Sequence, residues 1–471
     1  MTAGPKGRFL TGSTMGHVVR MTATGAMGIT FVFLVDAAGL LWISQLGDPR
    51  LVAAIGFGFA IQFFSVSSGV GLMIAATALI SRSIGADRAQ EARVQAGAGI
   101  VIASALQAVL AALVVLFRHD LLALAGATGD TATLAARYLA ITMPSLVVMA
   151  VALVASGALR AEGLGAKAMY VTLLSGVLLM VLDPVLILWL GWGLDGAAIG
   201  LFAFRILLMA LALYFAAYQH GLIAMPRTAD VYRIFRPYMI VALPAIATQM
   251  ATPAGNYILT IVMAPFGDDA VAAWAVVGRL TVVAFGGIFA LSGAIGGIFG
   301  QNYGAGQYDR VRSTYRDALL FCLGYTLVTW AILVLATPYV IVAFGLSGQG
   351  AEVLRAFTLI GVGGFVFVGA LFVSNAAFNN LGRPGRSTLV NWLKEGVFSW
   401  PAALALAALP VAALLLAEEG KAARAVGLYA LAERYPRYGA KHGPYVGTRK
   451  LYNRQAIMTE GGVHLHYGTE P

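Results

Sequence analysis

The chain has 471 residues, of which 59% are hydrophobic and 11% are charged. Soluble globular proteins carry roughly a quarter charged residues, so this composition excludes a soluble fold and indicates a chain that folds in a lipid bilayer. The formal net charge is +10. The lysines and arginines behind this charge fall mostly in short loops between apolar runs. That placement is typical of membrane proteins and does not indicate nucleic-acid binding.

Few residues suggest catalytic or metal chemistry. The single cysteine, Cys322, lies in an apolar run, so neither a disulfide nor a cysteine metal site is expected. No zinc-ligand cluster, serine triad or phosphate-binding loop is visible, so we expect no enzyme, no catalytic residue, no metal and no cofactor. His464 and His466 alternate in a polar tail and are not expected to form a metal site.

Eleven apolar runs are long enough to cross roughly 30 Å of hydrocarbon. The first follows basic residues, as a signal peptide does, but it is too long and lacks a small-residue cleavage site, so we interpret it as a retained span. The predicted spans cover residues 24–46, 51–80, 94–117, 134–158, 168–191, 195–218, 238–265, 270–299, 316–344, 352–380 and 386–417.

The basic residues predict how the chain crosses the membrane. With a cytoplasmic N-terminus, sixteen of the loop lysines and arginines up to residue 417 fall on the cytoplasmic side, and only Arg50, Arg118, Arg137 and Arg355 fall on the other. This bias follows the positive-inside rule. We therefore expect a multi-pass protein of the plasma (inner) membrane of a bacterium.

An internal repeat appears in the loops. Residues 81–86 (SRSIGA), after span two, recur as residues 300–305 (GQNYGA), after span eight, at an offset of 219. The same offset carries Gly163, after span four, onto Gly382, after span ten. Because six spans make one repeat, both copies enter the membrane from the same side, and their pseudo-two-fold axis should run along the membrane normal.

We therefore predict an all-α polytopic membrane protein with two six-helix lobes around a central cavity. The N-terminal lobe spans residues 1–226 with spans one to six, and the C-terminal lobe spans residues 227–417 with spans seven to eleven. Residues 418–471 are polar and contain no run of membrane length, so the twelfth helix is doubtful. This end is either a divergent tail or a truncated or frame-shifted terminus that leaves the protein inactive.

Several short segments form a recognisable set. They are residues 33–36 (FLVD), 45–48 (QLGD), 51–56 (LVAAIG), 79–86 (LISRSIGA), 158–163 (ALRAEG), 183–184 (DP), 193–198 (GLDGAA) and 300–305 (GQNYGA). Together they resemble the multidrug and toxic compound extrusion (MATE) family. The resemblance implies a twelve-helix transporter that exports amphipathic, often cationic organic compounds in exchange for protons or sodium by alternating access. Its partners would be small-molecule substrates and the lipid bilayer, with no obligate protein partner.

Three ionisable residues lie inside spans of the N-terminal lobe. Asp36 and Arg205 lie about 15 Å, and Asp183 about 12 Å, from the outer ends of their spans. Charged residues at such depths are costly and mark functional sites. The resemblance places Asp36 and Asp183 in the family's cation site, where Arg205 could keep one carboxylate ionised; in the alternative, Asp183 and Arg205 form a fixed ion pair that stiffens the lobe.

The surroundings of these carboxylates favour protons over sodium as the coupling ion. Leu179 stands four residues before Asp183, at a position where the family often has an asparagine, so sodium would find fewer ligands. The C-terminal lobe has no acid inside spans seven or ten, only Glu352 at an outer edge. A sodium site known in that lobe from part of the family is therefore not expected.

Polar residues on two spans are candidates for a substrate cavity. Gln249, Thr252 and Asn256 recur at helical spacing in span seven, and Asn375 and Asn379 do so in span ten. Such residues either line a cavity or hydrogen-bond neighbouring helices to one another.

Three charged residues in spans eight and eleven are further candidates. Lys394 and Glu395 lie about 12 Å into span eleven; adjacent helical residues point about 100° apart, so we expect no pair between them. Glu395 would attract a cationic substrate if it faced the cavity; in the alternative, either residue contacts a neighbouring helix or reaches the interface. Arg279 in span eight is expected to be structural, with a place in the cavity as the alternative.

The main alternative function is that of a lipid-linked precursor flippase of the same superfamily. It would share the two lobes and alternating access. Its cavity should carry several cationic residues to hold a pyrophosphate, whereas the N-terminal lobe offers the carboxylates of Asp36 and Asp183. We therefore favour the efflux transporter.

Overall fold

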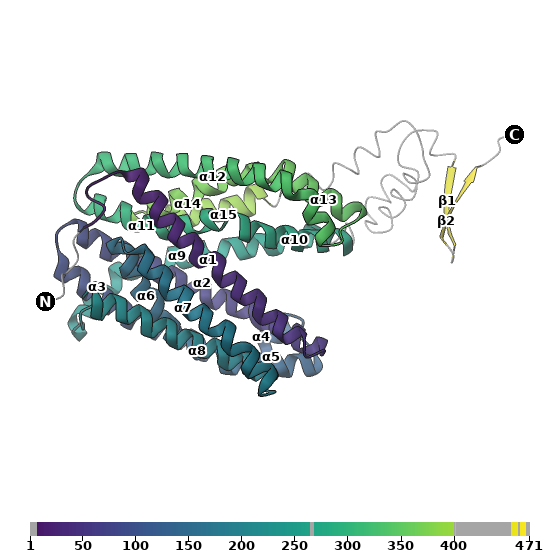
Figure 1. Cartoon of the computed structure of the whole chain (residues 1–471), viewed down its shortest axis with the longest axis horizontal. Helices are drawn as coiled ribbons and strands as arrows, with labels where there is room; N and C mark the ends of the chain where they lie inside the picture. The colour runs from purple at the N-terminus through teal and green to yellow at the C-terminus, as the bar shows by residue number, and fades with distance from the viewer. Residues whose placement is uncertain (1–6, 264–267, 400, 402–453, 460–461, 468–471) are drawn as a thin grey trace. The chain divides into compact units, whose positions relative to one another are not determined.

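The computed structural model describes residues 7–263, 268–399, 401, 454–459 and 462–467. Most of this described chain is helical (Figure 1). Within it, nine helices are long and apolar enough to cross a membrane, or ten if one bent pair counts as a single span. The predicted all-α polytopic membrane fold is confirmed.

The helices follow one another in two comparable series. The first half of the chain forms α1 (Thr14–Ser44), α2 (Pro49–Gly85), α3 (Ala89–Leu116), α4 (Arg118–Leu124), α5 (Gly129–Thr142), α6 (Ser145–Glu162), α7 (Gly165–Pro184), η1 (Val185–Trp189), α8 (Gly193–Leu213) and η2 (Tyr214–Gln219). The second half forms α9 (Thr228–Met263), α10 (Asp268–Ala284), α11 (Gly286–Gly304), α12 (Tyr308–Ala343), α13 (Gly348–Leu359), η4 (Gly361–Gly364), α14 (Phe365–Asn380) and α15 (Pro384–Leu393).

Three predicted spans are interrupted. Span four is broken between α5 and α6, because Pro144 has no N–H to continue the helix and disfavours helical geometry at the residue before it. Span eight bends by 46° between α10 and α11, and η4 splits span ten. The structure does not describe residues 402–417 of span eleven or the region of the doubtful twelfth helix.

The two halves pack in the same way. Helix α1 packs against α7 in its own half and crosses to α11 and α12 in the other half. Helix α9, its counterpart at the offset of 219, packs against α15 in its own half and crosses to α2 and α3. Since α15, α2 and α3 correspond at that offset to α7, α11 and α12, the predicted internal repeat is confirmed.

A symmetric pair of glycine contacts joins the halves. A Cβ on Gly85 of α2 would overlap the carbonyl oxygen of Gln301, and a Cβ on Gly304 of α11 would overlap that of Arg82. Gln301 and Arg82 are themselves equivalent at the offset of 219, so each repeat makes the same contact with the other, as a two-fold axis requires. Glycine is needed at both positions because the backbones approach too closely for a side chain.

Hydrogen bonds across the halves lie beside these glycines. The Arg82 guanidinium donates to the carbonyl oxygens of Asn379 and Asn380, both at 2.7 Å. The Gln301 amide donates to the carbonyl oxygen of Ala161 at 2.6 Å. The two halves are therefore held together by backbone acceptors as well as by close packing.

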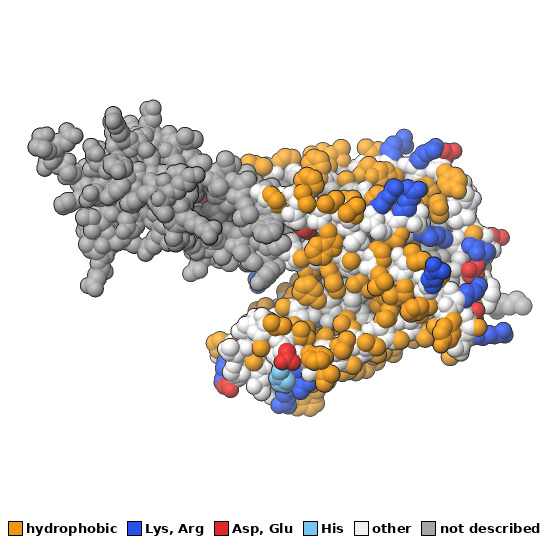
Figure 2. Space-filling model, turned by 180° about the vertical axis from the view of Figure 1, so that it is seen from behind, with side chains coloured by type: hydrophobic (Ala, Val, Ile, Leu, Met, Phe, Trp, Pro, Cys, Tyr) orange, Lys and Arg blue, Asp and Glu red, His pale blue; other side chains and the backbone are white. Residues whose placement is uncertain are grey.

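Most of the lysines and arginines in view gather at this same end of the molecule (Figure 2). We call it the arginine-rich end; it includes Arg82, Arg310 and Arg383 near the ends of α2, α12 and α14. At the opposite end the halves diverge (Figure 1), and a notch separates them in the space-filling view (Figure 2). The halves are thus closed together at the arginine-rich end and apart at the other.

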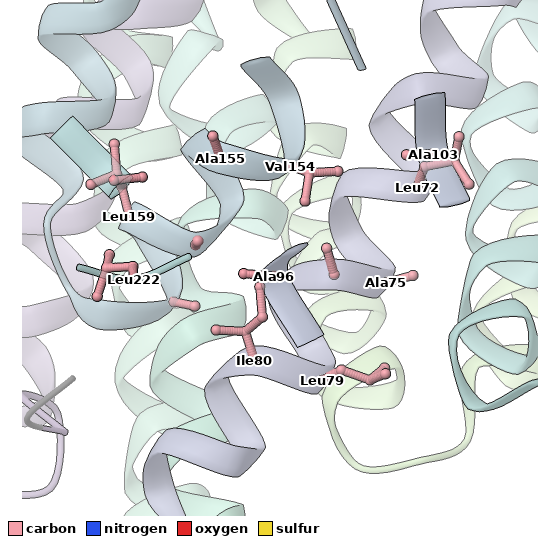
Figure 3. Packing of buried hydrophobic residues seen from close by; sticks show 14 of the residues in the cluster. Leu72, Ala75, Leu79, Ile80, Ala96, Ala103, Val154, Ala155, Leu159 and Leu222 are labelled. Atoms are coloured by element: carbon pink, nitrogen blue, oxygen red, sulfur yellow. The ribbon is translucent and has the colours of Figure 1, made fainter. Parts of the chain in front are cut away.

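The core of the first half is built from small and branched side chains. Leu72, Ile80 and Leu159 are buried among alanines of α2, α3 and α6, which let these helices approach closely (Figure 3). Tyr238 of α9 completes this core; it is fully buried, and its hydroxyl donates to the carbonyl oxygen of Leu72 at 2.6 Å. The first helix of the second half therefore stabilises the first half.

Residues from Lys394 onward form a separate compact unit. Its described parts are η5 (Lys394–Ser399), residue 401 and an antiparallel hairpin of β1 (Arg454–Thr459) and β2 (Gly462–Tyr467). These strands were not predicted, although residues 463–467 (VHLHY) alternate in polarity with the period of a strand.

Candidate functional site

Asp183 lies in a cradle of two glycines. It ends α7 beside Pro184, after which the chain continues as the π-helical segment η1, a distortion often found at functional sites. A Cβ on Gly200 of α8 would lie 2.5 Å from Asp183 Oδ1, and a Cβ on Gly39 of α1 would lie 3.2 Å from Oδ2. The carboxyl group fits between α1 and α8 only because both positions lack side chains.

The Asp183 carboxyl is poorly satisfied. The residue is 5% exposed, and Oδ1 has no hydrogen-bond partner among the described residues. A buried carboxylate without a partner is costly to keep ionised. Binding a proton at Asp183 therefore removes the cost of keeping a buried charge, and releasing the proton restores it.

Asp36 lies on the adjacent part of α1, one turn before Gly39, and is exposed. At about 100° per residue, it points well away from the exposed apolar stripe that includes Leu34 and Leu41. Asp36 and Asp183 are close enough for their charges to interact. The structure thus brings together the two carboxyl groups that the sequence singled out, one exposed and one buried.

Arg205 of α8 is buried and is held by neutral acceptors. Its guanidinium donates to Ser145 Oγ at 2.7 Å, to the Thr142 carbonyl oxygen at 3.1 Å and to Gln62 Oε1 at 3.5 Å. Among the described residues it forms no ion pair with Asp36 or Asp183, so the fixed pair considered above is not what holds it. Its charge nevertheless acts on Asp36.

The break at Pro144 explains how Arg205 is accommodated. Because Pro144 interrupts the helix, the Thr142 carbonyl oxygen is left to accept from Ser145 Oγ at 2.6 Å and from Arg205. Gln62 of α2 also donates to Thr142 Oγ1 at 2.8 Å. Sequence reasoning missed Gln62, Thr142 and Ser145; the only available signal was a polar group on each side of a proline within an apolar run.

The two polar residues of span ten differ in their contacts. Asn375 is buried, and its Oδ1 accepts from Ser387 at 2.7 Å and from Asn391 at 2.8 Å, joining α14 to α15. Asn379 is also buried, but only its backbone carbonyl accepts from Arg82, and its side-chain Oδ1 has no hydrogen-bond partner among the described residues. The contacts of Asn375 therefore correspond to the helix-joining alternative, and the role of the Asn379 side chain stays a prediction.

The candidates in span seven carry less structural information. Gln249 and Thr252 are half-buried in α9. Asn256 lies in the same helix, and its side chain is outside the part of the chain that the structure describes. The role of these three residues stays a prediction.

In the second unit, Lys394 and Glu395 form an ion pair with an N–O distance of 2.5 Å. This corrects the expectation that neighbouring helical positions keep them apart. The segment is π-helical, which changes the angle between successive side chains, and the four-carbon stem of Lys394 is flexible. Glu395 is therefore not a free carboxylate.

A model of the MatE family matches residues 26–185 and again residues 244–403. The two matches are offset by 218 residues, close to the offset found between the repeated loops, and together they cover most of the chain. The chain belongs to the MATE family. It is thus a multi-pass membrane transporter by family, and each half of it is one copy of the family's repeat.

Relatives of this MATE-family chain include transporters with different named substrates. The chain is 26% identical over 414 residues to the FAD transporter of Shewanella oneidensis, a match covering 86% of this chain and 89% of the relative. It is 23% identical over 351 residues to the multidrug export protein MepA of Staphylococcus aureus, covering 70% and 75%.

Solved MATE structures share the fold. The Vibrio cholerae MATE transporter VcmN superposes with a TM-score of 0.77 at 24% identity, over 84% of this chain and 93% of that one. An outward-facing multidrug resistance MATE transporter gives a TM-score of 0.78 at 20% identity, over 88% and 99%. The predicted two-lobe architecture is therefore confirmed for this MATE-family chain.

Proposed function

We propose that this chain exports amphipathic organic compounds across the plasma (inner) membrane of a bacterium in exchange for protons. The observation that carries the proposal is the pairing of a buried, partly unsatisfied Asp183 carboxyl with an exposed Asp36 carboxyl in one half of the molecule. A proton can reach such a pair from the exposed side and be held on the buried side. The charge of this half then depends on protonation.

The distribution of arginines supports an orientation for the cycle. By the positive-inside rule the arginine-rich end is cytoplasmic, as is the N-terminus. The notch at the opposite end then opens to the outside (Figure 2). In the proposed cycle, protons enter from the notch and neutralise a carboxylate of Asp36 or Asp183. The lost negative charge shifts the equilibrium between conformations toward the one that opens at the cytoplasmic end.

The surroundings of Asp183 favour protons over sodium as the coupling ion. A hard cation binds through several oxygen ligands. Here Gly39, Gly200 and the buried side chain of Leu179 surround the carboxyl, and Arg205 already contributes a positive charge near Asp36. A proton needs only one carboxyl oxygen.

For the substrate, Asp36 supports a cationic group. An exposed carboxylate within a membrane span attracts cations and disfavours anions in the space that it faces. The relative MepA is named a multidrug export protein, which supports a broad range of compounds. The likeness to a FAD transporter over most of both chains supports a second candidate function, export of a flavin nucleotide.

The proposal is tested with the purified chain in liposomes, with pH and sodium gradients imposed independently. We expect a fluorescent cation such as ethidium to move with a pH gradient alone, and Asp183→Asn to abolish that movement. Glu91→Gln, which removes a carboxylate from an exposed pair with Arg88, is the matched control and should transport normally. Transport that follows the sodium gradient alone would contradict proton coupling.

A further inference from the structure

Helix α2 turns one face toward the second half of the molecule. Ser81 on this face lies against Gly300 of α11, and the neighbouring Arg82 bonds to the backbone of α14. Phe63 and Phe64 precede Ser81 and Arg82 by eighteen residues, which is about five turns of an α-helix. The two phenylalanines therefore lie on the same face, further toward the end where the halves part.

The phenylalanines of this face are exposed. Phe59, Phe63 and Phe64 are 49%, 39% and 46% exposed, and the rings of Phe59 and Phe63 lie 5.9 Å apart. The opposite face of the helix, with Gly58 and Gln62, is buried inside the first half. We call the three phenylalanines the aromatic face; it borders the space between the halves.

Arg279 occupies the equivalent place on the second half. Helix α10 begins at Asp268, 219 residues after the first residue of α2, so Arg279 corresponds to Ala60, which shares a helix face with Phe63 and Phe64. Arg279 is exposed, and α10 lies on the side of the second half that is turned toward the first half in Figure 1. The pseudo-two-fold symmetry therefore directs Arg279 toward the same space as the aromatic face.

The Arg279 guanidinium has no hydrogen bond or ion pair with any other described residue. It lies eleven residues into α10, roughly 17 Å from the end of the helix. An unpaired cation at that depth is costly against lipid, and such residues face a bundle interior or a wet cavity. A structural role was expected for Arg279, with a place in the cavity as the alternative; the described part of the chain gives it no structural partner.

We propose that the space between the halves holds a binding site for planar aromatic compounds that carry an anionic group, with the ring on Phe59, Phe63 and Phe64 and the anion on Arg279. A guanidinium binds carboxylate, phosphate or sulfonate through paired, charge-assisted hydrogen bonds. Phenylalanine rings stack on planar ring systems. Together they select a flat ring and a negative charge in one ligand.

This inference rests on the proposed export function and gives a binding site to aromatic anions, the class to which the flavin nucleotide of the second candidate function belongs. Asp36 and Arg279 lie in different halves and carry opposite charges, so the site extends the range of compounds beyond cations. Arg279 is also a feature that the repeat does not share, since its counterpart Ala60 is neutral. The charge preference at this site is therefore built into the second half alone.

Binding of two xanthene dyes with opposite charge tests the site without any gradient. Fluorescein, an anion, and rhodamine 123, a cation, share the same ring system, and their fluorescence anisotropy reports binding to the purified full chain in nanodiscs. We expect Arg279→Gln to weaken fluorescein binding about tenfold or more and to leave rhodamine 123 as tight or tighter. Arg279→Lys keeps the charge and should retain part of the affinity.

Two further variants separate the site from general effects. Arg355→Gln removes another exposed arginine of the same half and should change neither dye. Phe63→Ala should weaken both dyes, because both stack through the ring. The proposal is overturned if Arg279→Gln leaves fluorescein binding unchanged, or weakens both dyes equally. Because no gradient is applied, this result stands apart from whether transport is coupled to protons.

Discussion

Gly85 of α2 lies so close to the carbonyl oxygen of Gln301 in α11 that no side chain fits at position 85. The repeat makes the same contact a second time between Gly304 and Arg82. Two symmetric backbone contacts beside the pseudo-two-fold axis make the arginine-rich end a tight joint. Any motion that opens this end must separate both of them together.

Gly85→Ala should therefore weaken the joint. The added methyl group overlaps the backbone of α11, which cannot move away as a flexible side chain would. We expect the apparent Tm of the purified protein to fall by several degrees. Gly324→Ala, at a helical glycine with no atom near its Cβ position, is the control and should be neutral or slightly stabilising. Equal Tm values for Gly85→Ala and Gly324→Ala would show that the joint is loose.

Gly200→Ala should interfere with the Asp183 carboxyl. Its Cβ would lie 2.5 Å from Oδ1, so the carboxyl must rotate or α8 must shift. We expect transport driven by a pH gradient to fall about tenfold or more, because the geometry of the proton site is lost. Gly56→Ala adds a methyl group where nothing lies within 4 Å and should transport normally. Parental rates for Gly200→Ala would separate Asp183 from the coupling step.

Arg205→Gln should affect both stability and coupling. Ser145 Oγ and the Thr142 carbonyl lose a charged donor, and a hydrogen bond to a charged group contributes about 1.5–3 kcal/mol. Loss of the charge that acts on Asp36 should also move the midpoint of the pH–transport profile. Arg205→Lys keeps the charge and should preserve that midpoint. An unchanged profile for Arg205→Gln, with only Tm reduced, would leave Arg205 a packing role alone.

The loop before α2 provides a test of stability against pH. Asp48 caps α2, and its carboxylate accepts from the Arg50 N–H at 2.9 Å and pairs with the Arg50 guanidinium. These hydrogen bonds hold the pKa of Asp48 below its usual value. A carboxyl whose pKa is lowered by folding stabilises the fold at pH values above its unfolded pKa, and the effect is lost as the pH falls through the folded pKa.

Asp48→Ala should therefore lower the apparent Tm at pH 7, by a modest amount because the site is exposed. The difference from the parent should begin to shrink as the pH falls below about 4, where an ordinary aspartate becomes protonated, and should disappear once the pH is below the lowered pKa of folded Asp48. Thermal unfolding measured across this pH range checks the expectation. A Tm difference that stays constant down to the lowest pH would mean that the carboxylate charge does not stabilise the cap.

Sequence patterns predicted the parts of this fold that repeat or that depend on hydrophobicity. The offset between residues 81–86 and residues 300–305 predicted the internal repeat, and the structure shows equivalent backbone contacts at Gly85 and Gly304 of its two copies. Asp36 and Asp183 were identified because a charged residue within an apolar membrane span is costly and marks a functional site. Each of these signals is local in the chain or recurs at one fixed spacing.

Other features depended on contacts between distant segments and could not be predicted. The acceptors around Arg205 come from three helices, and none of them forms a motif. The ion pair of Lys394 and Glu395 depended on a local π-helical turn that the regular 100° rule does not anticipate. Arg279 was expected to be structural because the sequence cannot show whether a charged residue has a partner. Its lack of one is visible only when the neighbouring residues are known.

The central claim is that substrate and proton exchange through Asp36 and Asp183. Its most direct test is proton release when ethidium is added to the purified transporter in weakly buffered solution, followed with a pH-sensitive dye. We expect the parent and Glu91→Gln to release protons as they bind ethidium, and Asp36→Asn to release far fewer at matched occupancy. Undiminished proton release by Asp36→Asn would contradict the claim.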